Sequence, residues 1–488
     1  MPSSASYSHR ASFSKDKKDK VGSSMGAVEV QSADVVEDVE AQGEKAVQQE
    51  GTFGNGGEDE VEYTTVGWFF TGLLLTKVMI GLGVLTIPST FHVLGLAPGV
   101  LIMVAIAIMT TWTDYYIGIF KTKHMEVYSL ADCGRLMFGK WGSYTFGAAY
   151  WLFTTFVAGS AFIGISTALN AISIHGTCTV VFVTVAAVVT YPFAALPRLE
   201  NIKWLSWVGL LSIVPSILLV TIAVAAGGRP SPAPQTGPLD LQLVMWGNPS
   251  FAEAMGAVAN LAFAFSGTPV FLPIASEMRR PQDFHKSVFL CQGFCTAFYL
   301  LVGIVMYNYA GVYVASPALG TAGELIKRVA YGIALPGLFV TAIIYVHLSG
   351  KAIFVRALRH SVHLTRKTRT HYLAWFGSTF GCLVFSYIVA EAIPVFGGLI
   401  GLIGALFGTL LTFHAEACMY LYDVWGTFRH PEQRTKKLWT GVIGNVLLLL
   451  IGTFLLIGGC YGSVHVIKES YDEAGGRPFS CADNSNST

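Results

Sequence analysis

The chain has 488 residues, of which 53% are hydrophobic and only 12% are charged. An ordinary soluble domain carries about twice that share of charged residues. Charge is also concentrated at the start, where residues 1–64 hold 6 Lys/Arg and 13 Asp/Glu. This composition is typical of a protein that crosses a membrane many times, and it excludes soluble enzymes, secreted disulfide scaffolds and nucleic-acid-binding proteins.

The first segment differs from the rest of the chain. Residues 1–64 are rich in Ser, Gly, Glu, Lys and Gln and carry few aromatic residues. A segment of this composition buries too little apolar surface to fold by itself. We therefore predict a disordered cytosolic tail over 1–64, either plainly solvated or regulatory. A transmembrane domain over 65–460 and an extracytosolic tail over 461–488 complete the predicted organisation.

Eleven apolar stretches follow the tail, and each is close to the 20 residues that an α-helix needs to cross the hydrocarbon core of a bilayer. The last of them, over 438–460, stands outside the two groups of five that precede it. The predicted spans are 66–92, 98–120, 144–172, 178–196, 202–226, 251–275, 288–310, 331–354, 372–395, 400–420 and 438–460.

Loop charges predict the orientation of these spans. If the N-terminus is inside, the inner loops carry 18 Lys/Arg, whereas the outer loops and the C-terminal tail carry 5. Because cytosolic loops are enriched in Lys and Arg, we expect a cytosolic N-terminus and an extracytosolic C-terminus. This orientation requires an odd number of spans, and eleven satisfies it.

The same topology predicts covalent chemistry on the outer side. Cys178 and Cys481 both fall there, in an oxidising environment, so we predict a disulfide between them; the alternative is two free thiols. The sequon at Asn486 lies on the same side and is a candidate glycosylation site. The other six cysteines show no CxxC or metal-ligand spacing and are expected to be reduced packing residues.

Two spans are interrupted by Gly and Pro. The first contains IGLGVLTIP at 80–88, and the sixth contains FAFSGTP at 263–269. Backbone groups freed by such residues are tolerated in hydrocarbon only where they line a polar cavity. The sequence shows no catalytic constellation and no repeated pore loop, so we expect neither an enzyme, nor a cofactor or metal site, nor a channel.

The interrupted spans are the first helices of two five-span halves, about 65–226 and 251–420. Transporters built from inverted repeats carry broken helices at such corresponding positions. A zwitterionic amino acid suits this arrangement: its carboxylate can meet N–H groups near Gly81 and Gly83, and its ammonium can meet carbonyls around Phe265 and Ser266. The alternative is that Gly and Pro merely kink the two helices.

Several motifs resemble the amino acid/auxin permease family. The most specific is the sixth-span run at 263–269 with its continuation IASEMRRPQDF at 274–284, and the first-span run and DCGRLMFG at 132–139 are also similar. The segments AEAIP at 390–394 and PFSC at 478–481 look like the fungal neutral amino acid permeases of that family. The resemblance covers about residues 65–482.

The resemblance implies an all-α polytopic fold of eleven transmembrane helices, with a LeuT-like 5+5 inverted repeat plus one extra helix. It also implies secondary active amino acid uptake, driven in fungal members by protons, at the plasma membrane or alternatively the vacuolar membrane. The substrate is expected between spans one, three, six, eight and ten. The candidate substrate-binding residues are Ile80, Gly81, Gly83, Phe265, Ser266, Gly267, Thr268 and Tyr150.

Two positions depart from the family pattern and are candidates for ion coupling. Lys77 lies near the middle of span one, where an ammonium costs about 2.5–3.5 kcal/mol on insertion scales. We hypothesise that its charge occupies the space of a sodium ion, which makes the carrier proton-coupled or ion-independent; the alternative is a lysine that reaches the cytosol. Glu416 in span ten is expected to pair with Lys77 or His414, or to reach the inner interface.

Three other acidic residues, Asp114, Glu253 and Glu391, are expected at solvated cavity mouths. The predicted function is secondary active transport of a neutral or aromatic amino acid across a lipid bilayer by alternating access, with a proton as co-substrate and no nucleic-acid partner. One alternative cargo is a cyclic imino acid or an amino-acid-derived metabolite, imported or exported. A second alternative is a transporter-like amino acid receptor.

Overall fold

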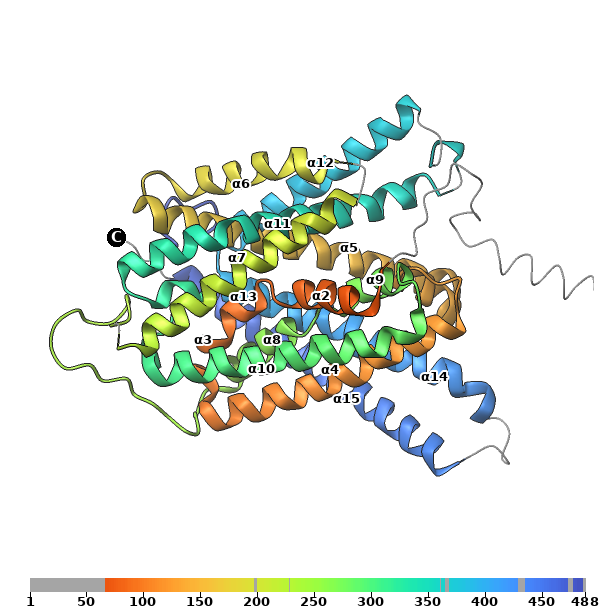
Figure 1. Ribbon diagram of the computed structural model, residues 1–488, viewed down its shortest axis with the longest axis horizontal. Coiled ribbons are helices and arrows are strands. Elements are labelled where there is room, and N and C mark those ends of the chain that lie inside the picture. Colours follow the sequence, from red (N-terminus) through yellow and green to blue (C-terminus); the bar gives the residue numbers. More distant parts are fainter. Residues whose placement is uncertain are drawn as a thin grey trace, which may run out of the picture. The chain divides into compact units, whose positions relative to one another are not determined.

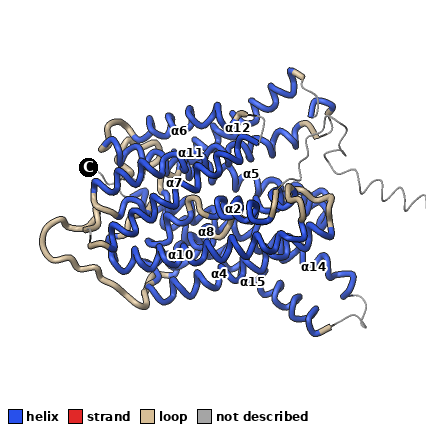
Figure 2. The backbone as a smooth tube through the Cα atoms, in the orientation of Figure 1, coloured by secondary structure: helices blue, strands red, loops and turns tan. Residues whose placement is uncertain are grey.

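The computed structural model describes residues 66–196, 200–227, 229–359, 361–364, 368–428, 435–472 and 477–485. Within these ranges every regular element is helical, and the only β-type pairing is an isolated bridge between Val66 and Met278 (Figures 1 and 2). The all-helical class is therefore confirmed. The predicted tail over 1–64 lies outside the described residues.

Each predicted apolar stretch corresponds to a helix or to a group of consecutive helical segments. The first three groups are α2 (Trp68–Met79) with η1 (Gly83–Thr86) and α3 (Ile87–Leu94), then α4 (Leu96–Lys123), then α5 (Leu130–Ser173). They are followed by α6 (Thr179–Ala194), α7 (Glu200–Ala225), and α8 (Phe251–Ala264) with η2 (Thr268–Val270) and α9 (Phe271–Ser276). The rest are α10 (Phe284–Ala310), α11 (Glu324–Ala357), α12 (Arg369–Ala392), α13 (Phe396–Ile403) continued by α14 (Ala415–Phe428), and α15 (Lys436–Asp472).

The number of spans is close to the prediction. Nine helices of the described chain are long and apolar enough to cross a membrane, and the bent pair of α2 with η1 and α3 makes ten. The remaining apolar helix, α6, has 16 residues and is about 24 Å long at 1.5 Å per residue, less than the usual hydrocarbon thickness. The protein is a multi-pass membrane protein, and the eleventh span stays a prediction.

Both predicted interruptions are present. The first helix ends at Met79, and the chain bends by 42° before it continues; Pro88 lies in the first turn of the continuing helix α3. The second helix ends at Ala264 and resumes at η2, where Pro269 again occupies the first turn. Proline has no N–H to donate, so it is tolerated at the start of a helix and not in its interior.

The two breaks lie in the interior. Residues 79–88 of the first break are all buried, and the most apolar window of the span from Phe251 to Ser276 is 83% buried, whereas that of α15 is 28% buried. Outward-facing side chains of α15, such as Leu450 and Ile457, are 64% exposed, as expected for a surface that contacts lipid. The helix breaks therefore lie in the packed core of the transmembrane domain, away from the acyl chains.

The span before Glu416 has an irregularity that the sequence did not predict. Two π-helical stretches, η7 (Gly404–Gly408) and η8 (Leu410–His414), connect α13 to α14. A Cβ added at Gly404 would lie 2.8 Å from the Cβ of Phe263, so this stretch packs tightly against the second broken helix. Single π-helical turns are frequent at functional sites because they locally change the helical register.

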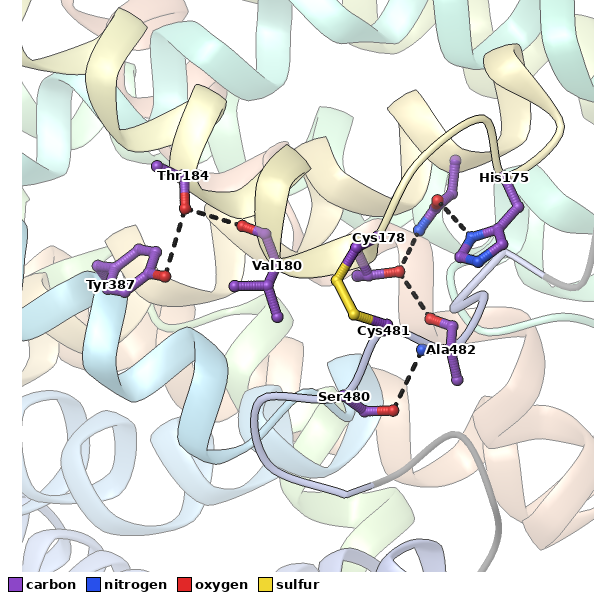
Figure 3. Close-up of a disulfide and its surroundings, with 10 residues drawn as sticks. His175, Cys178, Val180, Thr184, Tyr387, Ser480, Cys481 and Ala482 are labelled. Atoms are coloured by element: carbon purple, nitrogen blue, oxygen red, sulfur yellow. Dashed lines mark hydrogen bonds between the residues drawn. A yellow bond between two sulfur atoms is a disulfide. The ribbon is translucent and has the colours of Figure 1, made fainter.

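The C-terminal segment is fastened to the helix bundle. Cys178, which precedes α6, forms the predicted disulfide with Cys481 (Figure 3), and their Cα atoms are 4.4 Å apart. The Thr179 hydroxyl also donates to the carbonyl of Ala482 at 2.6 Å. The amide of Asn484 donates to Ser166 of α5 at 3.0 Å. The candidate glycosylation residue Asn486 lies outside the described residues.

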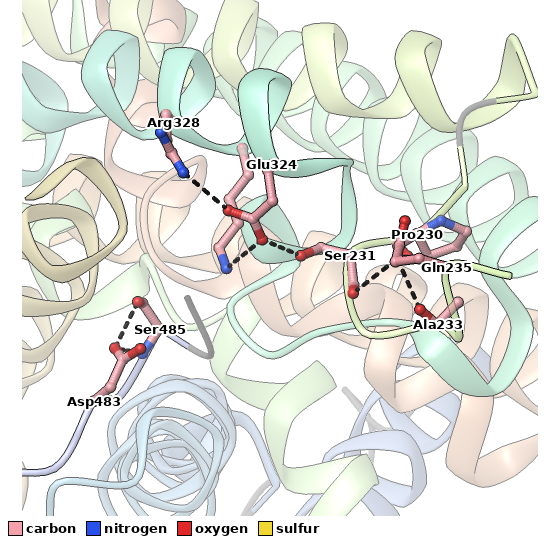
Figure 4. A network of polar contacts seen from close by, with 9 residues as sticks. Pro230, Ser231, Ala233, Gln235, Glu324, Arg328, Asp483 and Ser485 are labelled. Atoms are coloured by element: carbon pink, nitrogen blue, oxygen red, sulfur yellow. Dashed lines mark hydrogen bonds and ion pairs between the residues drawn. The ribbon is translucent and has the colours of Figure 1, made fainter. Parts of the chain in front are cut away.

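The loop before α8 is fastened to the start of α11. Glu324 accepts a hydrogen bond from the Ser231 hydroxyl at 2.7 Å (Figure 4). The same carboxylate lies 3.7 Å from Lys327 and 3.7 Å from Arg328 on the next helical turn. Of these contacts, the Ser231 hydrogen bond joins the loop to the helix, whereas the two ion pairs lie within α11.

Candidate functional site

The two helix breaks face one small cavity. Its volume is about 20 Å³, which is room for roughly one water molecule. An amino acid therefore fits only after the surrounding helices move apart. The lining comes from both breaks and from two neighbouring helices, and consists of Lys77, Val78, Met79, Gly81, Leu82, Gly83, Phe263, Ser266, Gly267, Phe153 and Val157 of α5, and Thr341 and Tyr345 of α11.

Gly83 brings the two breaks into direct contact. A Cβ added at this position would lie 2.6 Å from the Cα of Ala264, closer than any side chain can approach a backbone. The close contact with Ala264 of the second break therefore requires a glycine at position 83. Gly81 differs, because the nearest atom to an added Cβ is the Val78 carbonyl oxygen at 3.8 Å. Only one of the two glycines in the first break is demanded by packing.

A tyrosine on α10 joins the ends of both broken helices. The Tyr299 hydroxyl lies 2.7 Å from the carbonyl oxygen of Met79 and 3.1 Å from that of Ala264, and its one hydrogen can serve either. The side chain is fully buried. Its ring meets Phe265 edge-to-face, with the centroids 5.3 Å apart. Two carbonyls released by the breaks thus share one buried donor.

The predicted substrate-binding residues divide into two groups. Gly81, Gly83, Ser266 and Gly267 line the cavity. The Gly81 N–H, expected to be open to a carboxylate, donates to the Met79 carbonyl at 2.9 Å in this conformation. The remaining candidates lie close to the breaks or on α5 but do not line the cavity, and these are Ile80, Phe265, Thr268 and Tyr150.

Lys77 points into the cavity. Its side chain is 5% exposed, and its ammonium lies 3.4 Å from the hydroxyl of Thr341. A Cβ added at Gly209 of α7 would lie 2.7 Å from Lys77 Cε, so the lysine stem runs along that glycine. Among the described residues Lys77 makes no ion pair with Glu416, and its burial means that it does not reach the surface of the helix bundle.

Asp114 corrects one expectation from the sequence. We expected it at a solvated mouth, but it is fully buried. One carboxylate oxygen accepts from the Thr268 hydroxyl at 2.7 Å, and the other accepts from the Gln292 amide at 2.5 Å. The expectation for Glu391 is also wrong, because its side chain is 3% exposed. Helix lengths alone did not show that neighbouring helices cover both carboxyl groups.

Glu416 and Glu253 have opposite environments. Glu416 is 1% exposed, and neither carboxyl oxygen has a hydrogen-bond partner among the described residues. The expected partner His414 instead lies 3.0 Å from the carbonyl of Thr409. Glu253 is exposed and accepts the N–H of Ser250 at 2.7 Å, which closes a capping box at the start of α8.

Sequence reasoning missed the cavity walls and the polar residues of α10. Phe153, Thr341 and Tyr345 lie on helices that are apolar around most of their circumference, so periodicity does not show which face meets the site. Gln292 and Tyr299 carried a usable signal: polar side chains in an apolar span usually face the bundle interior.

The chain is similar to known transporters over most of its length. Residues 64–465 match the family described as transmembrane amino acid transporter protein. A transmembrane transporter of Fusarium pseudograminearum is 34% identical over 88% of this chain and 89% of its own length. The N amino acid transport system protein of Neurospora crassa is 31% identical over 87% of this chain and 90% of its own length.

More distant similarity is also found. The amino acid transporter AVT1I of Arabidopsis thaliana is 22% identical over 83% of this chain and 98% of its own. A solved structure of a Na⁺-coupled sialic acid symporter aligns with 82% of this chain and 90% of its own, at 13% identity and a TM-score of 0.49. On the family match and the fungal relatives, the chain belongs to the transmembrane amino acid transporter protein family and is a transporter, not an enzyme.

Proposed function

We propose that this protein moves a neutral or aromatic amino acid across its membrane by alternating access, with a proton as co-substrate. The observation that supports this most is the convergence of both interrupted helices on one buried cavity. Unpaired peptide groups at such breaks can hold the two charged ends of a zwitterion without charged side chains of their own.

The lining favours a substrate with an apolar side chain. Phe153, Phe263 and Tyr345 supply aromatic walls, which suit aliphatic or aromatic groups. No Asp or Glu is among the described lining residues, and Lys77 brings a single ammonium. A cationic amino acid would meet a like charge with no compensating carboxylate, so a neutral one fits better.

The small volume of the cavity supports a moving mechanism. A cavity of about 20 Å³ does not hold an amino acid, which supports a closed conformation as one state of the proposed cycle. Binding from either side would require the helices that carry the breaks to separate from α5 and α11. Rocking of one helix group around a site near the middle of the membrane is the general form of alternating access.

Two residues are the candidates for coupling. The Lys77 ammonium lies beside the first break, where a positive charge can substitute for a bound cation. Glu416 is a carboxyl without a hydrogen-bond partner in the described chain, a suitable carrier for a transported proton. A carrier that uses either residue would respond to pH and would not need sodium.

We place the protein in the plasma membrane with its N-terminus in the cytosol. The disulfide between Cys178 and Cys481 supports this orientation, because disulfides persist in oxidising compartments and are rare in the cytosol. The end of the bundle at which α6 begins, and to which the C-terminal segment is bonded, would then be extracytosolic. Protease protection of tags at the two termini in sealed vesicles tests this orientation.

The decisive experiment uses purified protein in proteoliposomes. We expect radiolabelled L-phenylalanine to exchange across the membrane and to accumulate when the outside is acidic. Unlabelled neutral amino acids should compete strongly, and lysine and glutamate weakly. Stronger competition by proline or another cyclic imino acid would change the substrate class. Saturable binding without exchange or accumulation would contradict transport and indicate a receptor.

A further inference from the structure

Two buried carboxyl groups lie beside the second break, outside the substrate cavity. Asp114 of α4 accepts one hydrogen bond at each oxygen, from Thr268 and Gln292. Both partners act as donors toward it, and donors stabilise an ionised carboxylate. A metal ion would instead need oxygen acceptors turned toward it. These two hydrogen bonds offset part of the cost of burying a negative charge on Asp114, and they suit an anion rather than a cation.

Glu416 of α14 is the second carboxyl, and its surroundings are different. It is 99% buried, and both oxygens lack a hydrogen-bond partner among the described residues. The Thr113 hydroxyl of α4 is the one donor near Glu416 among the described residues, and it donates to the carbonyl of Thr110 at 3.0 Å. An ionised carboxylate without a donor of its own is among the costliest groups to bury. Glu416 is therefore in its neutral, protonated form in this conformation.

The groups that face this pair supply no positive charge. Across the described chain, no Lys, Arg or His lies within ion-pair distance of Asp114 or Glu416. The titratable neighbours are the buried thiol of Cys295 on α10, which interacts with Asp114 and with the thiol of Cys291, and that of Cys133 on α5, which interacts with Glu416. Asp114 and Glu416 interact electrostatically, so two ionised carboxylates here would repel each other without compensation, and the pair holds one proton in this conformation.

The pair is also connected to the substrate cavity. Thr268, the donor to Asp114, begins η2 and directly follows the cavity residues Ser266 and Gly267. Glu416 lies two residues after the end of the π-helical stretch η8, which packs against η2. A negative charge on Glu416, in addition to that on Asp114, would therefore place one charge on each side of the second break. Such a charge favours a conformation in which water reaches the pair.

We propose that Asp114 and Glu416 form the site that carries the transported proton. A proton binds to a carboxylate oxygen of Glu416 from water on one side, and the same O–H bond breaks to release it to water on the other side. Asp114 keeps its negative charge and transmits the change to the break through Thr268. This site depends on the proposed proton-coupled transport and assigns the residues that perform it.

The test compares Glu416→Gln with the wild type in proteoliposomes, with radiolabelled L-phenylalanine as the probe. Gln keeps the size of the protonated side chain but cannot release a proton. We expect accumulation driven by an acid outside to fall at least tenfold, while exchange of internal for external phenylalanine is retained and no longer depends on pH. Glu391→Gln makes the same change at another buried carboxyl and should keep the accumulation.

The outcomes separate this inference from the proposed function. If the wild type exchanges no amino acid, the proposed function fails. If the wild type accumulates phenylalanine and Glu416→Gln accumulates it equally, only the proton site is overturned. Accumulation that needs sodium and ignores pH also overturns it. If Glu416→Gln is not monodisperse after purification, Glu416→Asp should shift the pH midpoint of accumulation, and an unchanged midpoint overturns the site.

Discussion

The Tyr299 hydroxyl lies 2.7 Å from the carbonyl oxygen of Met79, the last residue of the first broken helix. The same hydroxyl is within 3.1 Å of the carbonyl of Ala264, the last residue of the second. Because one O–H has one hydrogen, it satisfies the two helix ends in turn or shares itself between them. One side chain on α10 therefore links the ends of the two broken helices, the elements that move in the proposed transport cycle.

Replacing Tyr299 with Phe removes this link and keeps the ring that packs on Phe265. A buried hydrogen bond contributes about 0.5–1.5 kcal/mol, so we expect the initial rate of amino acid uptake to fall roughly two- to tenfold. Tyr309→Phe is the matched control, because Tyr309 lies on the same helix and is 50% exposed. Equal uptake rates for Tyr299→Phe and the wild type would contradict a role for the hydroxyl.

The two glycines of the first break should respond differently to the same change. Gly83→Ala forces its new Cβ to within 2.6 Å of the Ala264 backbone, so the breaks must separate. We expect thermal unfolding at a lower temperature and loss of uptake, because overpacking typically costs about 1–3 kcal/mol. Gly81→Ala meets nothing closer than 3.8 Å and should leave the unfolding temperature unchanged. Equal unfolding temperatures for the two variants would contradict the predicted contact.

Much of the fold follows from the sequence because the bilayer imposes a simple rule. A span must be apolar and about 20 residues long, so hydropathy located every helix group from α2 to α15. The two breaks were equally visible, since Gly83 and Pro269 disturb a helix by their own chemistry. The sequence alone therefore led to Gly81, Ser266 and Gly267 as cavity residues, because they lie at those breaks.

The rest of the site depends on side-chain direction, which an apolar helix does not encode. Phe153 and Tyr345 face the cavity whereas Tyr150 does not, although all three lie on helices that are apolar on most sides. Asp114 seemed near a helix end, yet Thr268 and Gln292 reach it from two other spans. Such contacts join residues more than 150 positions apart, and no local pattern predicts them.

Lys77 provides a separate test of the coupling mechanism. Its ammonium contacts the Thr341 hydroxyl and lines the cavity, so Lys77→Met removes a positive charge from the substrate site. We expect uptake to fall at least tenfold, while the residual uptake keeps its pH dependence because Glu416 still binds the proton. The measurement is initial uptake across a pH series. Lys437→Met, which changes an exposed lysine at the start of α15, is the control.

The opposite pattern would reassign the proton. If Lys77→Met abolishes the pH dependence and Glu416→Gln keeps it, Lys77 is the coupling group. If sodium begins to stimulate uptake in Lys77→Met, the lysine occupies the space of a sodium ion, as the sequence suggested. The two variants therefore distinguish a fixed charge that replaces a cation from a carboxyl that carries a proton.

The disulfide between Cys178 and Cys481 should stabilise the fold without taking part in transport. The bridge joins residues 303 positions apart, and removing a bridge of this kind typically costs about 2–4 kcal/mol. We expect Cys481→Ser to lower the midpoint of thermal unfolding by several degrees at a fixed heating rate. Cys178→Ser should do the same, and the double variant should add nothing, because each change breaks the same bond.

Reduction supplies the internal control for this prediction. A membrane-impermeant thiol reductant should destabilise the wild type to the level of Cys481→Ser and leave that variant unchanged. Cys460→Ser, which alters a free and half-buried cysteine, should unfold like the wild type. Exchange of amino acid should persist in Cys481→Ser, because the described cavity lining contains no residue of the C-terminal segment. Loss of exchange at unchanged unfolding temperature would instead place the C-terminal segment in the transport cycle.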